Sequence, residues 1–256
     1  MNLNKLLKGS VLAVGMAIGS LGTTAHAALI DIGFAIDESG SIGSSNYTTV
    51  KTGLANALSL IPTSGPDQYR IAVVSFDTTA TNIIAPPTVV TAANLATLQA
   101  TINAAPYNGG GTAIHAGVDR LTQLFTAVGL GDTTLFNVST DGQSSITALQ
   151  ASATAAYNAG VDGLSFEGIG GGVNTAGLLS VAFPTPSVLA TVATIPDPTQ
   201  HGFVLPIAGF ADYQAAINAK VQQIVNPTIP LPAALPLMAS GFGLMGFMGW
   251  RRRKAA

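Results

Sequence analysis

Short apolar runs alternate along this chain with longer segments in which apolar residues recur every three to four positions. The short runs, rich in valine, isoleucine and phenylalanine, indicate buried strands, and the longer segments have the period of helices packed by one face. Strands are predicted at residues 30–36, 69–76, 79–85, 133–139, 161–169 and 201–207. Helices are predicted at residues 47–60, 94–104, 112–128, 146–159 and 212–225. This alternation predicts an α/β fold, a doubly wound (Rossmann-like), mostly parallel sheet flanked by helices.

The first predicted strand ends abruptly in the turn Asp37-Glu38-Ser39-Gly40-Ser41. Aspartate, serine and glycine favour turns over regular structure. In an open α/β sheet, ligands bind just beyond the carboxyl ends of the strands. The turn therefore places one carboxylate and two hydroxyls where a site is expected. Such hard oxygen ligands suit Mg²⁺ or Mn²⁺ rather than zinc.

Two further stretches accompany this turn. Thr112 follows three glycines, residues 109–111, directly before a helical segment. Asp141 and Gly142 follow the fourth predicted strand. Together the three fragments resemble the von Willebrand factor A domain, whose metal-ion-dependent adhesion site consists of Asp-x-Ser-x-Ser, then a distant threonine, then Asp-Gly. Their order and approximate separation agree with that family.

The resemblance covers roughly residues 29–226 and implies a metal site. In that family the serines and the threonine bind Mg²⁺ through their hydroxyls, and the aspartates bind directly or through water. Carried over, the implied ligands are Asp37, Ser39, Ser41, Thr112 and Asp141. Neutral hydroxyls leave the ion short of negative charge, so a carboxylate from a partner can complete its octahedral shell. The alternative is that these are ordinary turn and cap residues, with Thr112 as a helix N-cap.

The composition narrows the class of partner. Of the 256 residues, 48% are hydrophobic and 9% charged, which suits one well-buried domain with apolar appendages. Between residues 28 and 232, four basic residues stand against all twelve acidic ones, a net charge of −8. Such a surface argues against nucleic acid as a partner. The absence of cysteine excludes disulfides and thiolate metal sites.

The sequence contains no recognisable catalytic constellation. Only His115 and His201 follow the leader, and neither Gly-x-Ser-x-Gly nor His-Glu-x-x-His occurs. The glycine run at 168–172 lacks the spacing of a phosphate-binding loop. The chain is therefore predicted not to be an enzyme. Glu167 has no assigned role, and nor has the Pro-rich stretch 173–200, where one short helix near residues 176–182 and then an ordered loop are expected.

The amino-terminal end is predicted to be a signal peptide, residues 1–27. It combines a basic start, an apolar stretch too short to span a bilayer and a small-x-small cleavage site. The mature domain would then span residues 28–226.

The carboxyl-terminal end is predicted to anchor or sort the protein. A Pro-rich linker, 227–232, precedes an apolar helix and basic tail, 233–256. Its uncharged part is at the lower limit for a membrane-spanning helix, and the basic tail is expected in the cytoplasm. The arrangement resembles the PEP-CTERM sorting signal of Gram-negative bacteria, which an exosortase-type membrane protease cuts. Here Pro230-Leu231-Pro232 stands where Pro-Glu-Pro is typical, so the sequence departs from the signal at the expected cleavage motif.

These observations predict a bacterial binding protein exported through the inner membrane to the periplasm, cell surface or extracellular matrix. It would engage a carboxylate of a protein or glycan partner through a bound Mg²⁺ (or Mn²⁺). The alternative is a structural component of an extracellular matrix or biofilm, in which the metal only stabilises the site loops.

Overall fold

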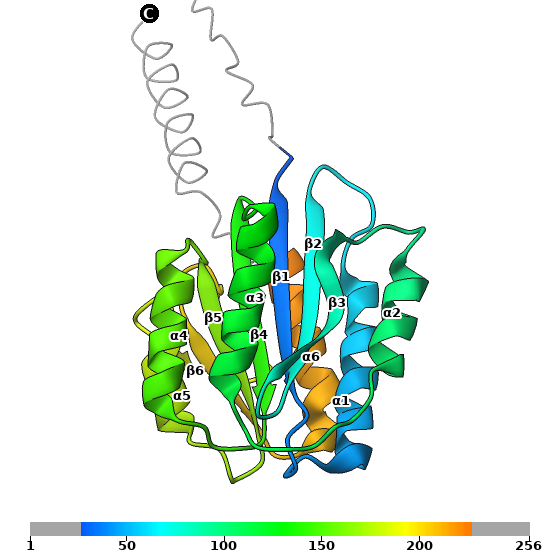
Figure 1. The fold of residues 1–256 in the computed structure, drawn as a ribbon. Coiled ribbons are helices and arrows are strands. Elements are labelled where there is room, and N and C mark those ends of the chain that lie inside the picture. The colour runs from blue at the N-terminus through cyan, green and yellow to red at the C-terminus, as the bar shows by residue number, and fades with distance from the viewer. Residues whose placement is uncertain (1–26, 227–256) are drawn as a thin grey trace, which may run out of the picture.

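A computed structural model of the chain describes residues 27–226 (Figure 1). The strands are β1 (Leu29–Asp37), β2 (Gln68–Phe76), β3 (Ala80–Val89), β4 (Thr133–Thr140), β5 (Gly163–Ile169), β6 (Val188–Leu189) and β7 (Phe203–Ile207). The helices are α1 (Gly43–Ala57), α2 (Leu95–Ala104), α3 (Ile114–Val128), α4 (Ile146–Asn158), α5 (Thr175–Val181) and α6 (Tyr213–Val225), with 3₁₀ turns η1 (Leu58–Leu60) and η2 (Phe210–Asp212).

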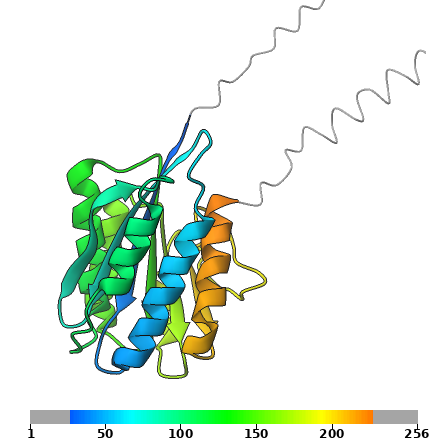
Figure 2. The same cartoon turned by 90° about the vertical axis from the view of Figure 1, so that its right-hand side faces the viewer.

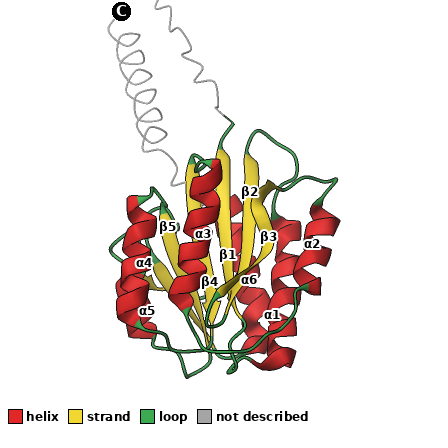
Figure 3. Cartoon of the chain, in the orientation of Figure 1, coloured by secondary structure: helices red, strands yellow, loops and turns green. Residues whose placement is uncertain are grey.

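These strands form one seven-stranded sheet in the order β3-β2-β1-β4-β5-β7-β6. β3 runs antiparallel to β2, and the other neighbouring strands pair in parallel. Figure 3 shows the sheet between two layers of helices. The predicted doubly wound, mostly parallel α/β fold is therefore confirmed.

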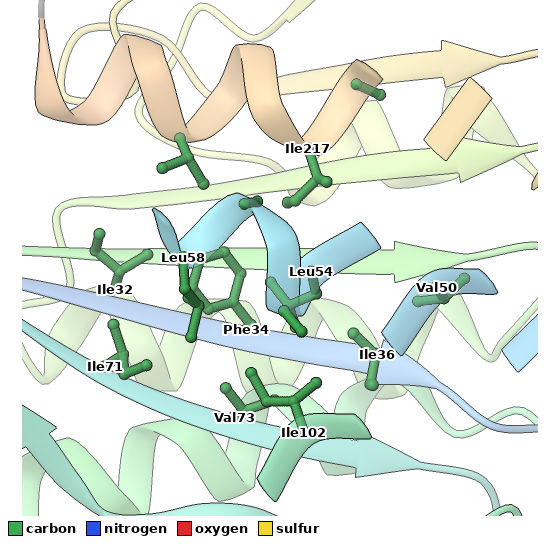
Figure 4. Packing of buried hydrophobic residues seen from close by; sticks show 14 of the residues in the cluster. Ile32, Phe34, Ile36, Val50, Leu54, Leu58, Ile71, Val73, Ile102 and Ile217 are labelled. Atoms are coloured by element: carbon green, nitrogen blue, oxygen red, sulfur yellow. The ribbon is translucent and has the colours of Figure 1, made fainter. Parts of the chain in front are cut away.

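The central strand β1 supplies one of the two hydrophobic cores with alternate side chains. Ile32, Phe34 and Ile36 point to the face covered by α1, α2 and α6, and each is at most 2% exposed. Figure 4 shows them among side chains such as Leu54 of α1 and Ile217 of α6. Alternation along a strand sends every second residue to the same face, and burying each such side chain contributes about 1.5–3 kcal/mol.

The opposite face of β1 is lined by small residues, and α3 packs directly on them. A Cβ added to Gly33 would lie 2.8 Å from the Phe136 ring. A Cβ added to Gly117 of α3 would lie 2.8 Å from Phe76 and 3.1 Å from the Cβ of Ala35. Larger side chains would push the helix away from the sheet. The small residues therefore let α3 lie close to the sheet.

The largest differences from the predicted elements are three. α1 begins at Gly43, four residues early, because its first turn is polar and shows no apolar period. β3 continues through Pro86 and Pro87 to Val89, which an edge strand tolerates since its outer N–H groups need no partner. The stretch 173–200 contains α5, as predicted, and also the unpredicted β6, which at two residues is too short to show a period.

Glu167 of β5, unassigned from the sequence, lies in the core beneath α6. It forms an ion pair with Lys220, and both side chains are at most 1% exposed. Lys220 Nζ and Glu167 Oε1 are in contact, but their geometry is not that of a hydrogen bond. Ser139 Oγ donates to the other Glu167 oxygen at 2.8 Å and lies 3.1 Å from the Tyr213 hydroxyl. Burial lowers the pKa of Lys220, and Glu167 opposes that shift. This cluster ties α6 to β4 and β5.

The described chain begins and ends at the same end of the sheet, where the strands of the parallel set start (Figure 2). The carboxyl edge of the sheet, where these strands end, lies opposite. Within residues 27–226, no helix is both long and apolar enough to cross a membrane. Apart from Ala27, the predicted signal peptide, linker (227–232) and carboxyl-terminal segment (233–256) lie outside the described residues.

Candidate metal centre

Asp37 ends β1 at the carboxyl edge of the sheet and is 1% exposed. Its Oδ1 accepts a hydrogen bond from the backbone N–H of Ser39 at 2.8 Å, and its Oδ2 accepts one from Thr140 Oγ1 at 2.6 Å. Thr140 ends the neighbouring strand β4, whose Ser139 lies opposite Ile36 in the parallel register. The register of the two central strands thus orients the Asp37 carboxyl group.

The two serines, Ser39 and Ser41, connect the buried carboxyl group of Asp37 to the more exposed one of Asp141. Ser39 Oγ lies 3.1 Å from Ser41 Oγ, and Ser41 Oγ donates to Asp141 Oδ1 at 2.7 Å. Ser39 is buried, whereas Ser41 is exposed and Asp141 is half-buried. The site therefore has a desolvated side at Asp37 and a solvent-facing side at Asp141.

Thr112 lies against the turn that follows β4. A Cβ added to Gly142 would lie 3.0 Å from both Thr112 Oγ1 and Thr112 Cγ2. α3 begins at Ile114, two residues later than predicted, and Ala113 occupies its N-cap position without a side-chain hydrogen bond. Thr112 is thus a loop residue next to Gly142, and the N-cap interpretation of it is wrong.

The structure brings all five predicted ligands to one place on the carboxyl edge. They come from three segments: the turn after β1, the loop before α3 and the turn after β4. Metal binding itself stays a prediction.

The electrostatics favour a cation there. Burial raises the pKa of Asp37 to about 6; hydrogen bonds from Ser39 and Thr140 act against the rise, and nearby Asp141 adds to it. In the described part of the chain, the ion pairs are Arg70–Asp31 and Lys220–Glu167, so neither carboxylate of the site is neutralised by a base. Two unpaired carboxylates, one desolvated, are stabilised by a positive charge between them.

The donor atoms define what kind of cation fits. Among residues 27–226, no three His, Cys, Asp or Glu side chains lie close enough together to hold a metal ion. A metal at this edge would therefore depend on hydroxyl ligands as well as on the two carboxylates. An all-oxygen set of two carboxylates and three hydroxyls fits a hard divalent cation such as Mg²⁺ or Mn²⁺.

Two buried residues that contact the site were not predicted. One is Thr140, which donates to Asp37; its place just before Asp141 at a strand end was the available signal. The other is Glu38, 1% exposed, whose carboxylate accepts hydrogen bonds from Ser75 and Asn108. An acidic residue between a buried strand and its turn was the only hint of its role.

The histidines do not form a catalytic group. His115 lines a 320 Å³ hollow between α3 and the turn after β2, and His201 Nδ1 lies 2.9 Å from the Pro186 carbonyl. In the part of the chain that the structure describes, neither ring hydrogen-bonds to a serine or an acidic side chain. Larger hollows of 460 and 520 Å³ lie between α4 and α5 and beside the end of α6, away from the five ligands.

Comparison with known families gives one match. The model of the von Willebrand factor type A domain matches residues 31–200. No curated protein matches the sequence.

Solved structures with the same fold include matrix and adhesion proteins. Proximal thread matrix protein 1 from the mussel byssus is 21% identical, with a TM-score of 0.58, over 77% of this chain and 46% of that one. A structure of the same protein with a zinc-occupied MIDAS motif is 19% identical, with a TM-score of 0.56, over 76% and 46%. The pilus adhesin of Lactobacillus rhamnosus GG is 14% identical, with a TM-score of 0.57, over 77% and 30%. This chain thus spans less than half the length of those proteins.

Proposed function

The chain belongs to the von Willebrand factor type A family, and from that premise we propose that it is an exported binding protein with a metal-dependent adhesion site. The observation that supports this best is the series of contacts at the carboxyl edge that runs from Asp37 through Ser39 and Ser41 to Asp141. The proposed ligands of Mg²⁺ or Mn²⁺ are Asp37, Ser39, Ser41, Thr112 and Asp141.

Each residue has a distinct part in this proposal. Asp37 and Asp141 supply the negative charge, while the three hydroxyls supply neutral oxygens. A divalent cation held there offers a coordination position to an oxygen of an incoming ligand. Because the protein contributes only two charges, a carboxylate on a protein or glycan partner is the ligand that suits the site. The exposure of Ser41 places the open side toward such a partner.

The similarity to a matrix protein and a pilus adhesin supports binding rather than catalysis. It also supports a second candidate, a structural matrix or biofilm component in which the metal only stabilises the three loops. The two differ in one measurement. Chelation by EDTA abolishes partner binding and leaves the fold intact in the first, whereas the second loses loop order without any partner to release.

The location is proposed from the sequence alone. Residues 1–27 would direct export, and the mature domain, residues 28–226, would face the periplasm, cell surface or matrix. Residues 233–256 would hold the chain in the membrane, with the tail in the cytoplasm, until an exosortase-like protease cuts near 230–232. The intact mass of the protein isolated from its host tests this, because a mature chain that still contained residues 1–27 would contradict export.

Metal titration by calorimetry tests the adhesion site. The purified chain is expected to bind one Mg²⁺ or Mn²⁺, and Asp37→Ala should weaken binding at least about a hundredfold, since even supporting residues of metal sites are worth about 10–100-fold. Asp212→Ala, which removes an exposed carboxylate outside the site, should bind as the wild type does. Undiminished affinity in Asp37→Ala would overturn the assignment.

A further inference from the structure

A second buried carboxylate lies directly behind the proposed metal site. Glu38 follows Asp37 and is 1% exposed. Its Oε1 accepts a hydrogen bond from Ser75 Oγ at 2.7 Å. Its Oε2 accepts one from the backbone N–H of Asn108 at 3.1 Å, and the Asn108 side-chain amide lies 3.3 and 3.2 Å from Oε1 and Oε2. Most of its partners therefore belong to a segment seventy residues away in sequence.

That segment, residues 105–113, is the loop that leads to Thr112. It has no regular secondary structure, and Gly109 and Gly110 adopt positive φ angles of 73° and 139°. Glycine admits these backbone conformations readily, so the loop has little local reason to keep one shape. Its conformation must be imposed by neighbouring segments.

Hydrogen bonds to neighbouring segments hold the loop from two sides. On the β1 side, Tyr107 donates its hydroxyl to the Ser39 carbonyl at 3.1 Å, and the Gly40 N–H donates to the Gly110 carbonyl at 2.9 Å. On the β2 side, the Gly111 N–H donates to Thr78 Oγ1 at 3.0 Å. Two buried charged side chains also contact the loop: Glu38 accepts hydrogen bonds from Asn108, and Lys51 donates to the Ala105 carbonyl.

The charge of Glu38 is balanced differently from an ordinary buried ion pair. Within residues 27–226, Glu38 forms no ion pair. The side chain of Lys51 donates instead to the carbonyls of Asn103 and Ala105. A buried carboxylate without a counter-ion needs hydrogen-bond donors to offset its desolvation. Because the loop supplies every donor except Ser75, moving Asn108 away leaves Glu38 with a single hydrogen bond.

We propose that Glu38 is a positioning residue, which holds the loop 105–113 by its Asn108 contacts and so places Thr112 against Gly142, in the turn that begins with Asp141. This inference rests on the adhesion site proposed above and assigns that site a supporting residue. Glu38 does not itself reach the cation. Its effect passes through the loop, so it should be detectable in the loop as well as in metal affinity.

The test uses Glu38→Gln, which keeps the size of the side chain but removes the charge. Mn²⁺ affinity is measured by titration, and hydrogen exchange is followed at the amides of residues 108–113. We expect Mn²⁺ to bind about two- to threefold more weakly, the lower end of what one hydrogen-bonding interaction is worth, because four of the five proposed ligands are unaffected. Loop amides should exchange at least several-fold faster, while the amides of β1 and β4 stay protected. Asn108→Ala should act in the same direction, and serves if Glu38→Gln does not fold.

Two further variants make the test specific. Combining Glu38→Gln with Thr112→Ala should weaken Mn²⁺ binding by less than the product of the single effects, because both act on the same loop. Glu167→Gln with Lys220→Met removes an equally buried carboxylate with its counter-ion and should change neither the loop nor the affinity. Unchanged loop exchange in Glu38→Gln, or equal changes in this core control, would overturn the inference. A wild-type chain that binds no Mn²⁺ would instead overturn the proposed function, and loop exchange would still decide whether Glu38 holds the loop.

Discussion

The protein contains two glutamates that are almost completely buried, and they differ in what balances their charge. Glu167 lies in the core, where Lys220 from α6 neutralises it and Ser139 donates to it. Glu38 lies under the carboxyl edge, where a serine and an asparagine donate hydrogen bonds to it and no base of the described residues pairs with it. The first joins a helix to two strands, and the second joins a strand end to a loop without regular secondary structure.

This difference separates two uses of a buried charge. Removing a partner from the core pair should weaken the whole fold, because an uncompensated charge remains where water cannot reach it. Removing a partner from the Glu38 contacts should act mainly on the loop, which can move and let water in. The Glu167–Lys220 pair therefore stabilises the whole fold, whereas the Glu38 contacts support the proposed site.

The largest effect is expected from Lys220→Met. The substitution leaves Glu167 buried and unpaired, and should lower the free energy of unfolding by about 3–5 kcal/mol. Urea denaturation followed by circular dichroism measures it. The double variant Glu167→Gln with Lys220→Met should regain most of the loss, because a neutral pair fills the same volume. A Lys220→Met protein with the wild-type midpoint would show that the pair does not stabilise the core.

A smaller and local effect is expected from Thr112→Ala. Asp37, Ser39, Ser41 and Asp141 remain, so most of the metal affinity should persist. Binding of a carboxylate-bearing partner should weaken about tenfold to a hundredfold, since a hydrogen-bonding group is lost from a desolvated site. A pull-down from the host's surface material, with and without Mg²⁺, would supply the partner for this measurement. Partner binding that survives both EDTA and this substitution would place recognition elsewhere.

The smallest expected effect is the change in stability and metal affinity with each unit of pH. The pKa of Asp37 is raised from 3.8 to about 6, so the folded, metal-free protein holds this proton more tightly than the unfolded chain. The resulting stabilisation is present below about pH 4 and is lost as the pH rises through about 6. Metal affinity should run the other way and fall about tenfold per unit below pH 6, because a proton and the cation compete for Asp37. Calorimetric titrations between pH 5 and 8 measure this; a flat profile would contradict it.

Much of the fold follows from the sequence because parallel strands, covered on both faces, are continuous apolar runs. The sequence alone could identify Asp37, Ser39 and Ser41 as candidate ligands, because they are neighbours in one turn. Thr112 and Asp141 needed the family resemblance, since only the fold brings distant segments together.

The residues that sequence reasoning missed depend on tertiary contacts. Thr140 reaches Asp37 through the register of β1 and β4, which no local pattern encodes. Glu38 is buried by a loop seventy residues away that has no periodicity. Lys220 was findable in principle, because it lies three residues after Ile217 and four before Ile224, on the apolar face of its helix.

The position of the chain ends has a consequence for how many copies would act together. β1 has nine residues, each about 3.3 Å long, so the proposed site lies about 30 Å from the end of the sheet (here called the pole) where the described chain begins and ends. Copies held side by side at that pole would all present their binding edges in one direction. A partner with repeated acidic groups would then bridge several copies, and once one contact formed, the local concentration of the next would raise overall avidity by about 10²–10⁴.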